Sequence, residues 1–176
     1  MIPWKMIDTT GVPGSDVELR LMQRGAEFSM KLGQNELMSS RLSGSEEALA
    51  TLACRRLEAV KSPHLLIGGL GMGFTLRAAL AVLGPAARIT VVELVPAVID
   101  WARGPMAEIF GDSLDDPRAT VLGADVIDVI ASKPQAFDAI LLDVDNGPEG
   151  LIRKANDALY DAKGLKAIHR ALKPGG

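Results

Sequence analysis

The segment that most constrains the fold is Leu65-Leu66-Ile67-Gly68-Gly69-Leu70-Gly71-Met72-Gly73, an apolar run that ends in closely spaced glycines. Apolar runs of this length are typical of buried parallel strands, and glycines at the end allow a sharp turn whose amides approach a ligand. Residues 74–83 are mostly good helix formers, and Gly84-Pro85 ends them. A strand, a glycine turn and a helix in this order predict a cofactor site at the turn.

The glycine spacing narrows the choice of ligand. A dinucleotide fingerprint needs a small residue three places after Gly71, and Phe74 stands there. A Walker-type phosphate loop needs a lysine after its last glycine, and the next residues are Phe74 and Thr75. The remaining pattern, Gly69-x-Gly71-x-Gly73, is typical of proteins that bind S-adenosylmethionine or a related nucleoside. For the glycines alone, a tight turn without a ligand remains the alternative.

Three more strands are predicted downstream, and each ends at or near a carboxylate. Glu93 ends the run 88–93, Asp125 follows the run 119–122, and Asp143 follows the run 137–142. Because the carboxyl ends of parallel strands share one edge of a sheet, we expect these acids beside the glycine turn. Glu93 is placed to accept both ribose hydroxyls and Asp125 to meet an adenine amino group. Each acid taken singly is also explained as a helix cap or a solvated strand end.

Several motifs along the chain match one known pattern. They are Ile67-Gly68-Gly69-Leu70-Gly71-Met72-Gly73, Val92-Glu93-Leu94, Asp116-Pro117-Arg118, Ala124-Asp125, Phe137-Asp138-Ala139-Ile140-Leu141-Leu142-Asp143, Leu159-Tyr160 and Leu172-Lys173-Pro174-Gly175-Gly176. Together they resemble the spermidine synthase (polyamine aminopropyltransferase) branch of the class I methyltransferase fold, from about Val17 to the end. The resemblance implies an α/β protein: a small N-terminal β-strand element in residues 1–44 and a Rossmann-like nucleoside-binding domain in residues 45–176. Ser45-Glu46-Glu47 is expected to begin a capped helix that joins the two.

The sequence stops where the resembling fold would continue. After a helix expected over 163–172, Pro174-Gly175-Gly176 should lead into a further strand, so the C-terminal strands are missing. Four parallel strands would leave one sheet edge exposed, and proteins cover such edges. We therefore expect a truncated chain or a homodimer in which a second copy covers the edge.

The resemblance also implies a transferase of polyamine biosynthesis. Its donor would be S-adenosylmethionine or decarboxylated S-adenosylmethionine, its product S-adenosylhomocysteine or methylthioadenosine, and its acceptor a small amine. In that family, an acidic pair is followed by Tyr, His and Glu, which hold the amine; here Ala50, Thr51 and Leu52 follow Glu46-Glu47. Three lost hydrogen bonds at roughly 1–3 kcal/mol each would weaken polyamine binding by orders of magnitude, unless the pocket was remade.

The loop after the fourth strand carries the remaining candidates. An ammonium acceptor has a pKa near ~10, as lysine does, so a carboxylate must help to remove its proton. Asp143, at the end of a central strand, is the catalytic candidate, and its alternative role is to bind the cofactor or cap the loop. Asp145 and Glu149 would attract a cationic acceptor or form a solvated acidic loop. The family usually has a second Asp where Asn146 stands.

Three functions stay open from the sequence. They are aminopropyl transfer to an amine, methyl transfer from S-adenosylmethionine to a small acceptor, and nucleoside binding without catalysis by a module of the same fold. The glycine turn does not say which carbon faces the acceptor. The losses at residues 50–52 keep the non-catalytic alternative open.

Composition argues against other classes of protein. A 176-residue chain that is 48% hydrophobic and 23% charged is large enough for one α/β domain with a short N-terminal element. A net charge of −3 without a basic track argues against a nucleic-acid partner, and no apolar run reaches ~20 residues, so we expect a cytoplasmic protein without a membrane partner. Cys54 is expected to be packed, and His64 and His169 lack a ligand pattern, so no metal site is predicted.

Overall fold

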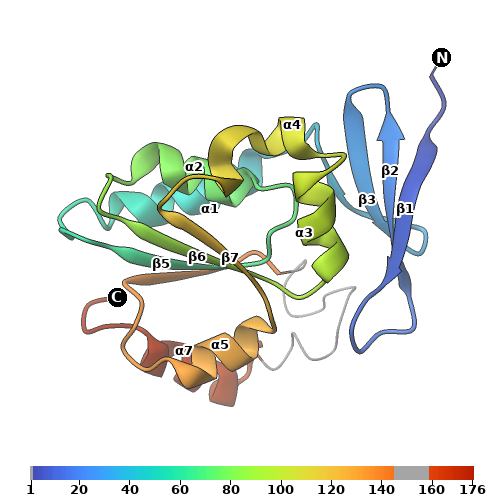
Figure 1. Ribbon diagram of the computed structural model, residues 1–176. Helices are drawn as coiled ribbons and strands as arrows, with labels where there is room; N and C mark the ends of the chain where they lie inside the picture. Colours follow the sequence, from blue (N-terminus) through green and yellow to red (C-terminus); the bar gives the residue numbers. More distant parts are fainter. Residues whose placement is uncertain (1, 145–158) are drawn as a thin grey trace.

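Two four-stranded sheets make up the framework of the protein in the computed structural model, which describes residues 2–144 and 159–176. The antiparallel sheet has the order β1-β2-β3-β4 and consists of β1 (Lys5–Gly11), β2 (Glu18–Arg24), β3 (Glu27–Leu32) and β4 (Asn35–Ser39). The parallel sheet has the order β7-β6-β5-β8 and consists of β5 (His64–Gly68), β6 (Arg88–Glu93), β7 (Ala119–Gly123) and β8 (Ala139–Leu142). The expected α/β fold with a preceding β element is confirmed (Figure 1).

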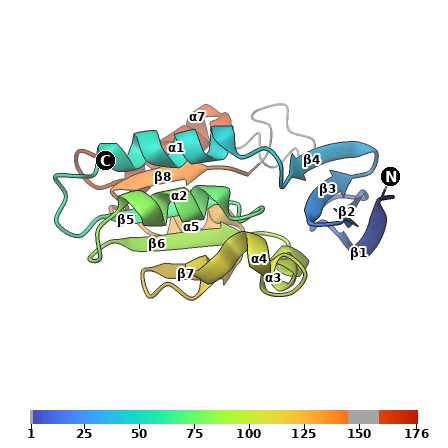
Figure 2. The ribbon, with the colours of Figure 1, turned by 90° about the horizontal axis from the view of Figure 1, so that it is seen from above.

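Helices cover both faces of the parallel sheet (Figure 1). One layer consists of α1 (Gly44–Arg55), α2 (Phe74–Val82), α3 (Pro96–Arg103), α4 (Ala107–Phe110) and the 3-10 turn η1 (Gly111–Leu114). The other layer consists of α5 (Val126–Ser132) and α7 (Ala162–Ala171). Figure 2 shows the antiparallel sheet beyond one end of this layered domain. Within the described residues, no helix is both long enough and apolar enough to cross a membrane.

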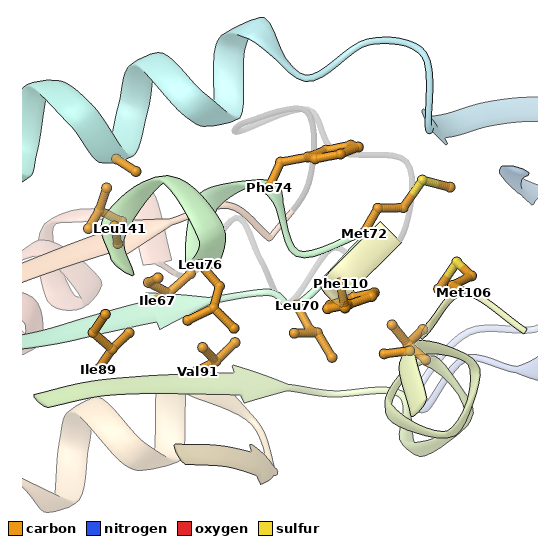
Figure 3. Packing of buried hydrophobic residues seen from close by; sticks show 14 of the residues in the cluster. Ile67, Leu70, Met72, Phe74, Leu76, Ile89, Val91, Met106, Phe110 and Leu141 are labelled. Atoms are coloured by element: carbon orange, nitrogen blue, oxygen red, sulfur yellow. The ribbon is translucent and has the colours of Figure 1, made fainter. Parts of the chain in front are cut away.

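Side chains of the parallel strands alternate between the two helical layers, as the two-residue period of a strand requires. Leu65 and Ile67 of β5 are fully buried in the core under α1 and α2, whereas Leu66 is buried in the core over α5 and α7. In Figure 3, Leu76 of α2 points toward the sheet, where Ile67 and Val91 meet it. Both faces of the central strands are therefore covered, which explains their nearly continuous apolar sequence.

The structure differs from the expected elements by single residues at several ends, and more clearly at the start of α1, at the start of β8 and at β1. Helix α1 starts at Gly44 after Ser43, which makes no side-chain cap hydrogen bond, so the expected cap at Ser45 is wrong. Ser45 lies inside the helix, and its hydroxyl donates to the Glu46 carboxylate at 2.6 Å. Strand β8 begins only at Ala139, and Phe137 forms an isolated parallel bridge with Leu172. Strand β1 was not predicted from the sequence.

Besides shared apolar packing, two hydrogen bonds between described residues join the antiparallel sheet to the layered domain. The indole Nε1 of Trp101, on α3, donates a hydrogen bond to Asp8 Oδ2 of β1 at 2.7 Å. The backbone N–H of Met72, in the glycine turn, points at the sulfur of Met38 of β4 at 3.1 Å. Both contacts lie at the carboxyl ends of the parallel strands, so the antiparallel sheet is held over the edge where a ligand is expected.

Candidate functional site

A cavity of about 370 Å³ lies between the two sheets, at the carboxyl ends of the parallel strands. Its size is within the range of small-molecule sites. The parallel-sheet side contributes Gly69, Gly71, Val92, Glu93, Leu94, Val95, Val98, Ala124, Asp125, Val126, Asp143 and Val144. The other side contributes Val12, Leu19, Met30, Leu37, Met38, Ser45, Glu46 and Leu49. The structure thus brings Gly69, Gly71, Glu93, Asp125 and Asp143 together, as the sequence predicted.

Gly69 forms the tightest part of the turn. Its φ of +92° favours glycine, and a Cβ there would overlap the carbonyl oxygen of Asp143. Its N–H donates to the carbonyl oxygen of Val92 at 2.8 Å, and the Asp143 N–H donates to the carbonyl of Gly68 at 2.8 Å. The glycine turn and the end of β8 are therefore in direct backbone contact, which fixes the position of the Asp143 backbone.

Gly73 has a different environment from the one expected. It is the N-cap of α2 with a φ of +78°, and a Cβ there would overlap the ring of Phe110. Of the three glycines in the motif, Gly69 and Gly71 line the cavity, whereas Gly73 faces the packed interior beside α4. Helix packing is therefore enough to explain glycine at position 73.

Glu93 is directed at the glycine turn. Its Oε2 accepts a hydrogen bond from the N–H of Leu70 at 2.9 Å, and its Oε1 accepts one from the N–H of Val95 at 2.8 Å. The residue is 8% exposed, and burial raises the pKa of its carboxyl group, although the backbone N–H groups act against this. The backbone N–H groups of Gly71 and Leu94 also act to lower this pKa, so the carboxylate is held by the glycine turn on one side and by the segment after β6 on the other.

Asp125 caps the helix after β7. Its Oδ1 accepts a hydrogen bond from the N–H of Ile127 at 2.9 Å, which identifies it as the N-cap of α5. It also lines the cavity. The structure therefore contains both features considered for this residue, a helix cap and a position at the ligand site.

Asp143 follows β8 directly and faces the same cavity. The hydroxyl of Thr75, in the first turn of α2, donates to Asp143 Oδ2 at 2.7 Å. Burial raises the pKa of this carboxyl group; the Thr75 hydrogen bond lowers it, and the negative charge of Glu46 raises it further. A half-buried carboxylate with a raised pKa suits a group that must accept a proton near neutral pH. Sequence reasoning missed Thr75, for which the sequence carried no signal.

The other sequence candidates are not among the described residues that line the cavity. Asp145, Asn146 and Glu149 are outside the described residues. Leu52 is 63% exposed on α1, and Ala50 is fully buried. On this helix, the residues that reach the cavity are Ser45, Glu46 and Leu49.

The wall contributed by the N-terminal part of the chain is apolar. Val12, Leu19 and Met30 are almost fully buried there, and Leu37 and Met38 are partly buried. The sequence reasoning expected strands in residues 18–38 but assigned none of these side chains to the site. Their alternation along the strands was the available signal, although it does not reveal which sheet face meets the cavity.

The charged side chains among the described lining residues of the cavity are all acidic. Glu46, Glu93, Asp125 and Asp143 contribute four carboxylates, and none of the described residues that line the cavity is Lys, Arg or His. Such a site favours ligands that carry positive charge, such as a sulfonium or an ammonium group, and disfavours ligands that bring a carboxylate of their own.

A parallel sheet flanked by helices on both faces, with a glycine turn after its central strand, places the domain in the Rossmann-like class I methyltransferase fold. Residues 46–176 match the family model described as the spermine/spermidine synthase domain, so the chain belongs to this family. The expected resemblance is therefore confirmed.

Individual relatives agree with this assignment. The chain is 34% identical over 122 residues to polyamine aminopropyltransferase 1 of Streptomyces coelicolor, covering 67% of this chain and 22% of that relative. It is 35% identical over 113 residues to putrescine N-methyltransferase 2 of Nicotiana tabacum, covering 64% and 30%. The solved spermidine synthase of Thermotoga maritima has the same fold, with a TM-score of 0.73, 21% identity and coverage of 96% and 54%. The chain thus spans less than a third of these curated relatives and about half of the solved one.

Proposed function

We propose that the chain forms the donor-binding part of an aminopropyltransferase that uses decarboxylated S-adenosylmethionine and an amine acceptor. The observation that supports the donor most strongly is the cluster of carboxylates in a cavity where no described lining residue is cationic. The decarboxylated donor carries a sulfonium and an ammonium group but no carboxylate. S-adenosylmethionine would bring a carboxylate into this negative field without a partner of opposite charge.

The carboxylates of the cavity have different roles in donor binding and in transfer. Glu93 holds the ribose and the glycine turn, and Asp125 contacts the adenine. Asp143 accepts a proton from the acceptor's ammonium group, which frees the nitrogen lone pair. The nitrogen forms a bond to the propyl carbon next to the sulfonium; the carbon–sulfur bond breaks, and its electron pair stays on sulfur in methylthioadenosine. Asp143 then releases its proton to water, and Thr75 keeps its carboxylate oriented throughout.

Activity and binding measurements test this proposal together. Incubation with decarboxylated S-adenosylmethionine and an amine should release methylthioadenosine. Asp143→Asn should slow that release at least about a hundredfold, the usual size of a general-base contribution, with little change in donor affinity. Asp100→Asn, which removes an exposed carboxylate on α3, is the matched control and should keep full activity.

Calorimetry compares the affinity of the protein for the two possible donors. Decarboxylated S-adenosylmethionine should bind at least about tenfold more tightly than S-adenosylmethionine, because the latter's carboxylate finds no cationic partner. Tighter binding of S-adenosylmethionine together with release of S-adenosylhomocysteine would contradict the proposal and indicate methyl transfer. Nucleoside binding without release of either product would indicate a non-catalytic module.

A further inference from the structure

Three successive backbone N–H groups of the glycine turn are held by two different side chains. The N–H of Leu70 donates to the Glu93 carboxylate at 2.9 Å, and the N–H of Gly71 also acts on that carboxylate. The N–H of Met72 donates instead to the sulfur of Met38, on β4, at 3.1 Å. The turn is therefore held by the parallel sheet from one side and by the antiparallel sheet from the other.

We propose that Met38 is a positioning residue of the donor site, and that its thioether fixes the part of the glycine turn that meets the nucleoside. The proposal rests on the proposed function for the identity of that nucleoside. Met38 and Gly71 both line the cavity, so a movement of the turn changes the surface that a ligand meets there. In this role Met38 acts through the backbone of the turn.

The side chain of Met38 lies directly against the turn. A Cβ added at Gly71 would be 2.9 Å from both the sulfur and the terminal methyl carbon of Met38. Met72 is fully buried, and a buried N–H that loses its acceptor costs free energy even where that acceptor is as weak as a thioether. Without the sulfur, the turn must shift to bring the Met72 N–H to another acceptor.

The antiparallel sheet gives Met38 a fixed base. Met38 is half-buried and pairs across the two strands with Met30 of β3, which is 4% exposed. Side chains of directly opposed residues on neighbouring strands lie in contact, which restricts the conformations of Met38. An unbranched thioether can then reach from β4 to the glycine turn, which a shorter β-branched side chain would not do.

The test removes the sulfur and keeps an apolar side chain of similar size. Met38→Leu should bind methylthioadenosine at least about fivefold more weakly than the unchanged protein in calorimetric titrations. Met22→Leu is the matched control, because it makes the same change at a half-buried position on β2 that does not line the cavity. Its affinity should stay within about twofold of the unchanged protein.

Two further measurements separate positioning from a general role in folding. Hydrogen exchange of the Met72 amide should become at least about fivefold faster in Met38→Leu, whereas the Ile67 amide of β5 should exchange at its original rate. The urea unfolding midpoint should hardly change. In methylthioadenosine release, the KM for the decarboxylated donor should rise about fivefold while kcat stays within about twofold, because Asp143 and Thr75 are untouched.

The outcomes distinguish this inference from the proposed function. Equal affinity of Met38→Leu and the unchanged protein overturns the inference, and so does an unchanged exchange rate of the Met72 amide. A large fall in the unfolding midpoint overturns it by assigning Met38 to the stability of the fold. Weaker binding confined to Met38→Leu, without product release by any of the proteins, overturns the proposed transfer and supports the positioning role. Failure of the unchanged protein to bind methylthioadenosine overturns both.

Discussion

At the residue scale, the site depends on two carboxylates, the buried Glu93 and the half-buried Asp143, whose pKa values are raised by removal from water. Glu93 accepts two backbone N–H groups, and Asp143 accepts the Thr75 hydroxyl. These donors orient the acids but do not cancel the cost of removing them from water. The two acids are therefore held in fixed positions at some cost to the stability of the fold.

We expect Glu93→Gln to weaken nucleoside binding. The amide NH₂ would face the N–H of either Leu70 or Val95, which leaves one buried donor without its acceptor at a cost of roughly 1–3 kcal/mol. The displaced turn should lower the affinity for methylthioadenosine about tenfold, as measured by calorimetry. The control Glu108→Gln, on the exposed side of α4, should keep the affinity; equal affinities in both variants would contradict the role of Glu93.

Asp143 gives a pH prediction with a definite sign. Its pKa in the folded state is raised, so the native protein binds this proton more strongly than the unfolded chain does. The free energy of unfolding should therefore contain a favourable contribution at low pH that is lost as pH rises above the ordinary aspartate value of about 3.9. Urea unfolding from pH of about 4 to about 7 should show Asp143→Asn becoming progressively more stable relative to the wild type.

The opposite result would assign Asp143 a structural role. If Asp143→Asn became less stable relative to the wild type as pH rises, the ionised carboxylate would be contributing to the fold. Loss of activity together with a gain of stability at neutral pH is the combination expected of a catalytic group.

Much of the candidate site could be predicted at this scale. Gly69, Gly71, Glu93, Asp125 and Asp143 follow predicted strands, and strand ends in a parallel sheet meet at one edge, so spacing alone brought them together. Thr75 and Leu49 could not be found in this way. Their positions depend on how two helices rotate against the sheet, and local sequence does not encode that rotation.

At the element scale, two of the three motif glycines are needed for different reasons. Gly69 has its positive φ next to the Asp143 backbone, whereas Gly73 has its positive φ against an aromatic ring. The same motif therefore brings β5 close to β8 and sets the packing of α2 on α4.

Gly73→Ala should destabilise the protein strongly. A left-handed φ costs a residue with a Cβ about 1–2 kcal/mol, and the overlap with Phe110 adds to this. We expect a loss of at least about 2 kcal/mol in urea unfolding. Gly84→Ala, where a Cβ would meet nothing within 4 Å, is the control. The loss should shrink in a Phe110→Leu background; an undiminished loss would mean that the ring is not responsible.

The elements that were predicted correctly are those whose sequence carries one strong local pattern. Strands β5 and β6 and helix α3 were recognised because apolar runs and a proline at the first helical position are strong local signals. Strand β1 was missed because five of its seven residues are exposed, so its sequence shows no alternation. Its pairing with β2 depends on a neighbour from another part of the chain.

At the scale of the whole molecule, the site requires two sheets that share no strand. The strand ends of the parallel sheet supply three of the four acids, and the antiparallel sheet supplies much of the apolar lining opposite them. The hydrogen bond from Trp101 to Asp8 is one of the contacts that fix their relative position, and it lowers the pKa of Asp8.

Asp8→Ala should therefore weaken the attachment of the antiparallel sheet to α3 without unfolding either sheet. The Trp101 indole N–H, in a residue only 2% exposed, would lose its acceptor. We expect the affinity for methylthioadenosine to fall about threefold by calorimetry with a nearly unchanged unfolding midpoint. Asp16→Ala removes an exposed acid between β1 and β2 and should change neither quantity. A large drop in the unfolding midpoint would show that the contact supports folding rather than the site.

Separate origins of the two walls have an evolutionary consequence. Under the proposed function, substitutions on β2, β3 or the start of α1 would change the acceptor side of the cavity while the acids at the ends of the parallel strands stay in place. Under the same proposal, relatives that keep the three strand-end acids would differ in acceptor choice through the opposite side of the cavity.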